Sequence, residues 1–195
     1  MRRAFTLVEF IVILAIIAVL AAMLLPIYQR PHRGGARRSD CQSNLKMLGL
    51  GFNQYIQDYN EKFPPLKTSS KVGWTIALKP YVGNWYAFHC VSANGKRRNT
   101  TTDYFYNSRL ARRSQAEFEW LETIILGGDG KADASTRYAI SQLPSNWVDD
   151  AKSPSYRHVE GANYLFADAH AKYLSPDKIT LDKPSQSGSY TFLPR

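Results

Sequence analysis

The chain has 195 residues, with 25 Lys and Arg against 16 Asp and Glu, and a formal net charge of +9 at pH 7. This length fits one soluble domain beyond an apolar N-terminus, and a hydrophobic fraction of 44% argues against a disordered chain. The two cysteines, Cys41 and Cys90, are too few for a disulfide scaffold, but one bridge between them is permitted if the domain is exported.

The positive charge is grouped in clusters, and such clusters suit nucleic acid, anionic lipid or an acidic partner. A solvated basic surface is the simpler interpretation. The clusters are Arg30, Arg33, Arg37 and Arg38; Lys96, Arg97 and Arg98; and Arg109, Arg112 and Arg113. Without residues 1–4, which include Arg2 and Arg3, the chain would still carry about +7 by the same count of side chains.

Residues 5–25 form the first predicted element, an apolar helix in which only Thr6 and Glu9 are polar. At about 31 Å this helix would be long enough to cross the hydrocarbon core of a bilayer. Arg2 and Arg3 precede it, which predicts a cytoplasmic N-terminus with the rest of the chain outside. An acid in an apolar membrane helix is costly and usually has a partner, so Glu9 points to a specific role for this helix.

The segment from Arg2 to Glu9, Arg-Arg-Ala-Phe-Thr-Leu-Val-Glu, resembles the class III signal of type IV prepilins and type II secretion pseudopilins. The resemblance implies that prepilin peptidase cuts between Ala4 and Phe5 and N-methylates Phe5. It also implies that the new amino group, on this subunit or a neighbour, neutralises Glu9 inside an apolar filament core. That family usually has Gly before the cut, where this chain has Ala4.

The same resemblance implies a structural subunit of a type IV pilus-like or type II secretion pseudopilus filament. The expected partners are other pilin-like subunits, prepilin peptidase and an inner-membrane assembly machinery. The precursor would be a single-pass inner-membrane protein with its C-terminal domain outside the cytoplasm, and the mature chain would join an extracytoplasmic filament. A secretory signal cut after Ala21 fits less well because Glu9 lies in its apolar region, and a twin-arginine signal usually has a longer basic region.

Residues 28–35 are predicted to interrupt the helix, because Pro31 removes a backbone donor and Gly34–Gly35 are poor helix formers. We expect helicity to resume over residues 36–59, where apolar residues spaced by three and four form one stripe. Pro64–Pro65 forbids continuation. The stripe consists of Cys41, Leu45, Leu48, Phe52, Tyr55, Ile56 and Tyr59.

The remaining chain has short apolar-aromatic runs separated by turn signals, which predict strands. Residues 163–174 are the best hairpin candidate, with a turn near Asp168–His170. The runs are Trp74–Leu78, Trp85–Cys90, Tyr104–Tyr106, Thr123–Leu126, Tyr164–Ala167 and Ala171–Leu174.

The expected fold class is therefore α+β. A long N-terminal hydrophobic helix, pilin-like and broken near Pro31–Gly35, would continue into an amphipathic helix packed on a mostly antiparallel sheet. The predicted divisions are a leader peptide at 1–4, a transmembrane or filament-core helix at 5–27, a hinge at 28–35 and a soluble pseudopilin domain at 36–195.

A second resemblance covers nearly the whole soluble part. It is carried by Cys41–Lys46, Phe63–Pro65, Phe88–Cys90, Tyr104–Ser108 and the segment from Arg157 to Asp168. These residues resemble a pseudopilin family that is called processing-associated and is named for a His-x9-Asp-Gly signature. His158 and Asp168 have the signature spacing, and Ala169 stands where the signature has Gly. Alanine tolerates a left-handed turn less well than glycine does.

His158, Asp168 and His170 are candidate zinc ligands, because two imidazoles and a carboxylate suit a site with one open position. Hydrogen bonding to the backbone at turns is the competing interpretation, so no metal ligand set is assigned. Residues 129–133, Asp-Gly-Lys-Ala-Asp, resemble a calcium loop without its closing glutamate, and Asp149–Asp150 are further calcium candidates.

The sequence has no nucleophile elbow, phosphate-binding glycine loop or Cys-x-x-Cys pair, so an enzyme is not expected. Two functions remain as alternatives to the filament subunit. One is a minor pilin that holds DNA through the basic clusters during uptake, with strongly salt-dependent affinity. The other is a membrane-anchored metal-binding protein that uses His158, Asp168 and His170.

Overall fold

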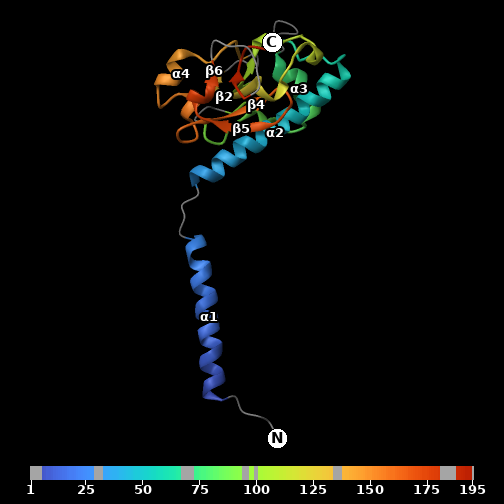
Figure 1. Ribbon diagram of the computed structural model, residues 1–195. Coiled ribbons are helices and arrows are strands. Elements are labelled where there is room, and N and C mark those ends of the chain that lie inside the picture. Colours follow the sequence, from blue (N-terminus) through green and yellow to red (C-terminus); the bar gives the residue numbers. More distant parts are fainter. Residues whose placement is uncertain are drawn as a thin grey trace. The chain divides into compact units, whose positions relative to one another are not determined.

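A computed structural model describes residues 6–28, 33–66, 73–93, 97–98, 101–133, 138–180 and 188–194; within these ranges, the side chains of 23–28, 33–36 and 132–133 lie outside the description. The chain divides into two compact units, Met1–Arg33 and Gly34–Arg195. Helix α1 (Leu7–Tyr28) forms the first, and the second holds the other helices and all the strands (Figure 1).

Helix α1 begins with a reciprocal exchange of hydrogen bonds between Thr6 and Glu9. The backbone N and Oγ1 of Thr6 donate to Glu9 Oε2 at 2.8 and 2.9 Å, and Glu9 N donates to Thr6 Oγ1 at 3.3 Å. This is a capping box, in which two backbone donors of the first turn find side-chain acceptors. Glu9 therefore has a local role at the helix start.

The expectation of a membrane helix at residues 5–27 is wrong. Within the described residues, no helix has both the length and the apolarity needed to cross a bilayer. The long N-terminal helix of the predicted fold class is corrected accordingly.

Part of the segment 28–35, in which the sequence predicts a hinge, is helical. Helix α1 ends at Tyr28 and α2 (Arg33–Asp58) begins at Arg33, so Gly34 and Gly35 lie inside a helix. Each glycine weakens a helix by about 1 kcal/mol relative to alanine, but most helical stability in proteins comes from tertiary packing. The packed remainder of α2 outweighs this cost. Pro31 lies outside the described residues.

Helix α2 presents the predicted apolar stripe to the core. Its stripe residues from Cys41 to Ile56 are at most 7% exposed, whereas Tyr59 lies beyond the helix end and is 52% exposed. Phe52 stacks on Tyr106 with ring centroids 5.5 Å apart, which places the helix against the sheet. The 3.6-residue periodicity thus identified the buried face correctly.

Five strands form a mixed sheet in the order β3-β1-β2-β4-β5. Neighbouring strands are antiparallel except β1 and β3, which are parallel. Strands β6 (Ile179–Thr180) and β7 (Tyr190–Thr191) make a separate parallel pair. The five strands of the main sheet are β1 (Thr102–Asn107), β2 (Ile125–Asp133), β3 (Ala139–Ile140), β4 (Ala162–Phe166) and β5 (Ala171–Leu174).

The sheet is buried on both faces, and the domain is α+β. Side chains alternate along β1, so Tyr104 and Tyr106 join the core under α2 while Phe105 enters the opposite core. The opposite core contains Trp147 from the short helix α4 (Ser145–Asp149) and Phe192 from the C-terminal segment. Burial on both faces explains why all residues of β1 are buried.

Two of the predicted strands are helical. Trp74–Leu78 lies in helix α3 (Trp74–Val82), and Trp85–Phe88 forms the 3-10 helix η1, whose first turn is capped by the side chain of Asn84. In α3, Trp74, Thr75 and Leu78 are buried, which is the spacing of one helical face. A short apolar run does not distinguish such a face from a strand.

The hairpin predicted over residues 163–174 is confirmed. Strand β4 pairs antiparallel with β5, from Ala162 opposite Leu174 to Leu165 opposite Ala171. Ala169 in the connecting turn adopts the left-handed conformation with φ 73°. The helix α2 also approaches here, since a Cβ on Gly49 would lie 2.7 Å from the carbonyl oxygen of Ala169. The turn therefore forms although alanine stands where the signature has glycine.

Ala169→Gly is expected to raise the free energy of unfolding by about 0.5–1 kcal/mol. The left-handed conformation costs alanine about 1–2 kcal/mol, which exceeds the extra entropy that glycine loses on folding. Urea denaturation of the full chain measures the change. The matched control, Ala171→Gly in strand β5, should lower stability by a similar amount because glycine weakens a strand. A less stable Ala169→Gly variant would contradict strain at this turn.

Candidate functional site

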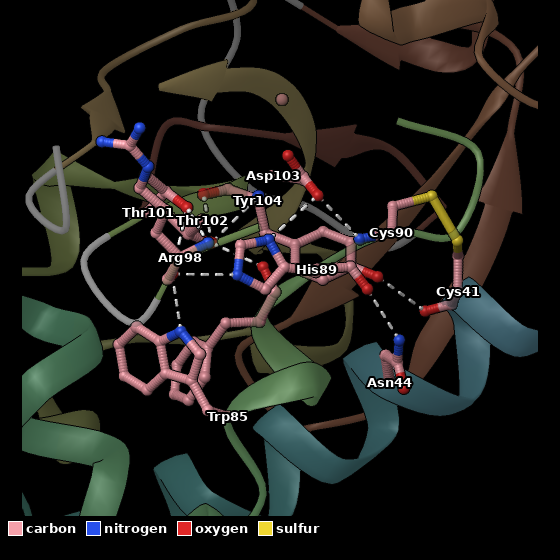
Figure 2. Close-up of polar contacts among 12 residues, drawn as sticks. Cys41, Asn44, Trp85, His89, Cys90, Arg98, Thr101, Thr102, Asp103 and Tyr104 are labelled. Atoms are coloured by element: carbon pink, nitrogen blue, oxygen red, sulfur yellow. Dashed lines mark hydrogen bonds and ion pairs between the residues drawn. A yellow bond between two sulfur atoms is a disulfide. The ribbon is translucent and has the colours of Figure 1, made fainter. Parts of the chain in front are cut away.

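A buried disulfide lies at the centre of the candidate site. Cys41 in α2 is bonded to Cys90, which follows η1, and both residues are 0% exposed. The bridge joins positions separated by 49 residues and ties the helix to the segment that leads into β1. Figure 2 shows it beside a group of polar side chains from α2, η1 and β1.

His158 donates a hydrogen bond to Asp129 beside this bridge. Nε2 of His158 lies 3.5 Å from Cys90 Sγ and 3.2 Å from Asp129 Oδ2, and the two paired side chains are 1% and 0% exposed. The carboxylate of Asp129 also accepts two further hydrogen bonds. Asn163 N donates to Oδ2 at 2.8 Å, and Arg157 Nη1 donates to Oδ1 at 3.1 Å. Asp129 therefore links β2 to β4 and to the segment after the 3-10 helix η5 (Pro154–Tyr156).

The Arg157 guanidinium compensates the buried charge of Asp129. A buried carboxylate is costly unless it is paired and hydrogen-bonded. Arg157, whose side chain is 11% exposed, also donates to the backbone oxygens of Asp103 and Gly130. An ionised carboxylate can only accept hydrogen bonds. Because Nε2 of His158 faces Asp129, we assign the proton of His158 to Nε2. Nδ1 of His158 is buried without a hydrogen-bond partner among the described residues.

A second buried His–Asp pair contacts the backbone of Cys90. His89 Nδ1 is 3.2 Å from Asp103 Oδ2, and the same oxygen accepts Cys90 N at 3.1 Å (Figure 2). His89 Nε2 is 3.3 Å from the backbone oxygen of Arg98, and the side chain of Asn44 donates to the backbone oxygen of His89 at 2.9 Å. These contacts hold the segment around Cys90 against α2 and β1.

The predicted zinc ligands do not form one group. Asp168 and His170 lie in the β4–β5 turn, where Asp168 Oδ1 is 2.6 Å from His170 Nδ1 and accepts the backbone N–H of His170. The His170 ring stacks on Phe166 at 4.3 Å. Among the described residues, His158 is instead grouped with Cys41 and Cys90 as potential metal ligands. His158 and Asp168, which have the His-x9-Asp spacing, therefore each pair with a different residue and not with each other.

The calcium candidates are also placed by the structure. Asp129, the first residue of the 129–133 segment, lies within strand β2, and its carboxylate accepts hydrogen bonds from Arg157 and Asn163. Asp149 ends helix α4, and Asp150 accepts the backbone N–H of Lys152 at 2.8 Å. The residues do not share a loop of the kind that the sequence suggested.

Part of the basic surface is used for contacts within the domain. Arg109 Nε donates to the backbone oxygen of Ser141 at 2.7 Å. Arg113 pairs with Glu117 at 2.9 Å and lies over the ring of Phe118. These two arginines stabilise local structure, which favours the simpler interpretation of their cluster.

Residues 30–88 match a family model described as a protein of unknown function, DUF1559. The match includes Cys41 and ends before Cys90, Asp129 and His158. No curated protein and no solved structure matched the chain.

The processing residues Ala4 and Phe5 lie outside the described residues. Sequence reasoning missed the central role of Asp129, Arg157 and Asp103. The sequence indicates Asp129 only as a calcium candidate, because its partners lie on other elements. A buried aspartate within a run of apolar residues and glycines, Ile-Ile-Leu-Gly-Gly-Asp, was the signal that could have identified it.

Proposed function

We propose that the chain is a structural subunit of a pilus-like or pseudopilus filament outside the cytoplasm, matured between Ala4 and Phe5 and assembled through α1. The observation that carries this proposal is the apolar surface of α1, whose large side chains from Leu7 to Leu20 are 45–76% exposed. They are Leu7, Val8, Phe10, Ile11, Val12, Ile13, Leu14, Ile16, Ile17, Val19 and Leu20.

These side chains surround the helix, so one groove on a partner would cover only part of them. A helix that is apolar on all sides requires cover on all sides. A bundle of α1 helices from other copies of the chain supplies such cover, and full burial of each large side chain is worth about 1.5–3 kcal/mol. We therefore infer that α1 packs against the α1 helices of neighbouring subunits.

Glu9 is the one charged residue in this apolar stretch. In the single chain, its hydrogen bonds with Thr6, first with the backbone N–H and then with the hydroxyl, lower the pKa of Glu9 and keep it ionised. A carboxylate enclosed in a bundle needs a cation, and the amino group created by cleavage before Phe5 would supply one. The capping bonds leave room for this pairing because a carboxylate accepts at two oxygens.

A further observation supports a location outside the cytoplasm. The Cys41–Cys90 bridge is of the kind that persists in oxidising compartments.

Ile16→Glu is expected to abolish filaments, because it buries an unpaired charge in the helix bundle at a cost of several kcal/mol. Glu9→Leu should reduce the amount of filament about tenfold, which corresponds to a loss of about 1.4 kcal/mol of association free energy. Electron microscopy of sheared surface material and the N-terminal mass of the subunit provide the measurement. Glu122→Leu, which removes an exposed acid of the folded domain, is the control and should assemble normally.

Normal filaments from Ile16→Glu would exclude assembly through α1. A mature chain that begins at a residue other than Phe5 would refute the proposed processing. Both variants should keep the circular dichroism and the disulfide of the folded domain, since α1 belongs to a separate compact unit.

A further inference from the structure

Three potential ligand atoms converge at the buried bridge, and Asp129 lies beside one of them. Cys41 Sγ, Cys90 Sγ and a ring nitrogen of His158 lie within 4.8 Å of one another. His158 Nε2 is 3.5 Å from Cys90 Sγ and 3.2 Å from Asp129 Oδ2. The four residues come from α2, the segment after η1, β2 and the segment after η5, so the tertiary fold alone brings them together.

Two of the distances, those from His158 to Cys90 and to Asp129, match the distances between ligands of one zinc ion. With Zn–S near 2.3 Å and Zn–N or Zn–O near 2.05 Å, a tetrahedron has edges of about 3.6 Å between sulfur and nitrogen and about 3.4 Å between nitrogen and oxygen. The observed His158–Cys90 and His158–Asp129 separations differ from these by about 0.2 Å or less. In the reduced chain, Cys41 and Cys90 Sγ need to move apart to about 3.8 Å.

The charges of such a site also balance. Two thiolates and the Asp129 carboxylate carry three negative charges, while Zn²⁺ and the Arg157 guanidinium carry three positive charges. Arg157 donates to Oδ1 of Asp129, whereas Oδ2 faces His158. One lone pair of Oδ2 accepts the hydrogen bond from Asn163 N, and its other lone pair is free to bind the metal. A neutral cluster avoids most of the cost of burying its separate charges.

We propose that the reduced chain binds one zinc ion through Cys41, Cys90, His158 and Asp129, and that formation of the disulfide releases it. Binding sends both thiol protons to solvent and moves the His158 proton from Nε2 to Nδ1. A disulfide-bonded oxidant then removes two electrons from the two sulfurs, which form the S–S bond. The oxidant takes two protons from solvent and becomes two thiols, and Zn²⁺ leaves.

The bridge and the zinc ion are thus alternative ways to hold Cys41 against Cys90. Before oxidation, zinc would keep the two thiolates together and protect them from reaction with other thiols. This inference does not depend on filament assembly, because all four ligands belong to the unit Gly34–Arg195.

Metal titration of the full chain tests the proposal. The chain is reduced with a phosphine under anaerobic conditions and titrated with Zn²⁺ against a chromophoric chelator, and separately with Co²⁺. We expect one equivalent of metal, thiolate-to-cobalt charge-transfer absorption and the d–d bands of a tetrahedral site. The disulfide-bonded chain should bind at least about 100-fold more weakly because both thiolates are lost.

His158→Ala and His158→Gln should each weaken zinc binding by about 10–100-fold or more in the reduced chain. Asp168→Asn and His170→Ala are the matched controls and should bind as the wild type does, because these residues lie at the hairpin turn. Circular dichroism of the zinc-loaded proteins reports whether the variants fold. The wild-type cobalt spectrum tests thiolate ligation even if a variant fails to fold.

Three results would overturn the proposal: a reduced wild-type chain that takes up no zinc, equal binding by the disulfide-bonded chain, or unchanged affinity in both His158 variants. Loss of zinc in the Asp168 or His170 variant, with retention in the His158 variants, would instead place the metal at the hairpin turn and also refute it.

Discussion

Replacing Cys41 and Cys90 together by alanine is expected to lower the free energy of unfolding by roughly 4 kcal/mol. The disulfide joins positions 49 residues apart, and closing a loop of that size in the unfolded chain corresponds to about this free energy in the chain-entropy description. Urea denaturation followed by circular dichroism measures the loss, with a chelator present so that metal binding does not contribute. This is a large fraction of the stability of an ordinary domain.

Reduction of the wild-type chain provides the matching control. A phosphine should destabilise the wild type by nearly the same amount in the presence of chelator, and should leave the double alanine variant unchanged. A loss below about 1 kcal/mol in both experiments would show that the bridge adds little beyond the surrounding packing. Added zinc should restore part of the stability to the reduced wild type and none to the alanine variant, because a ligand that binds only the folded state stabilises it.

The parts of the fold that depend on local periodicity could be predicted from the sequence. The stripe from Cys41 to Ile56 predicted the buried face of α2, and alternation with turn residues predicted the β4–β5 hairpin. The strand predicted at Trp74–Leu78 is wrong, because a run of four or five apolar residues fits a strand and one face of a short helix equally well. The parallel pairing of β3 with β1 is a tertiary property that no local pattern records.

The N-terminal helix differs from its sequence-based prediction. A run of apolar residues predicted a membrane span, and no helix of the described chain qualifies as one. The sequence predicts that Glu9 pairs with the amino group created before Phe5, and Thr6 and Glu9 also have the spacing of a capping box. Local hydrogen bonding accounts for the acid in the single chain, and the filament would add a second role.

The candidate site could not be predicted because its pairs are distant in sequence. Asp129 and Arg157 are 28 positions apart, and Cys90 and His158 are 68 apart. The fixed spacing of His158 and Asp168 suggested that they act together. In the structure, His158 pairs with Asp129, and Asp168 pairs with His170. Spacing identified a buried histidine, and only the tertiary structure identified its partner.

Asp129→Asn is expected to lower the free energy of unfolding by about 3–5 kcal/mol in the disulfide-bonded chain. The amide lacks the negative charge that compensates the Arg157 guanidinium, and removing one partner of a buried ion pair leaves an uncompensated charge. It also weakens the acceptor for Asn163 N. Urea denaturation with a chelator present measures the change.

Asp103→Asn is the matched control, since Asp103 is also buried but pairs with His89, which can be neutral. Its cost should be nearer 1–2 kcal/mol, the value for a weakened hydrogen bond without an isolated charge. Adding Arg157→Met to Asp129→Asn should recover at least about 1 kcal/mol, because the second change removes the unpaired cation. Strictly additive losses would mean that the two side chains act independently, and Asp129 would then stabilise the domain through its bonds to the backbone alone.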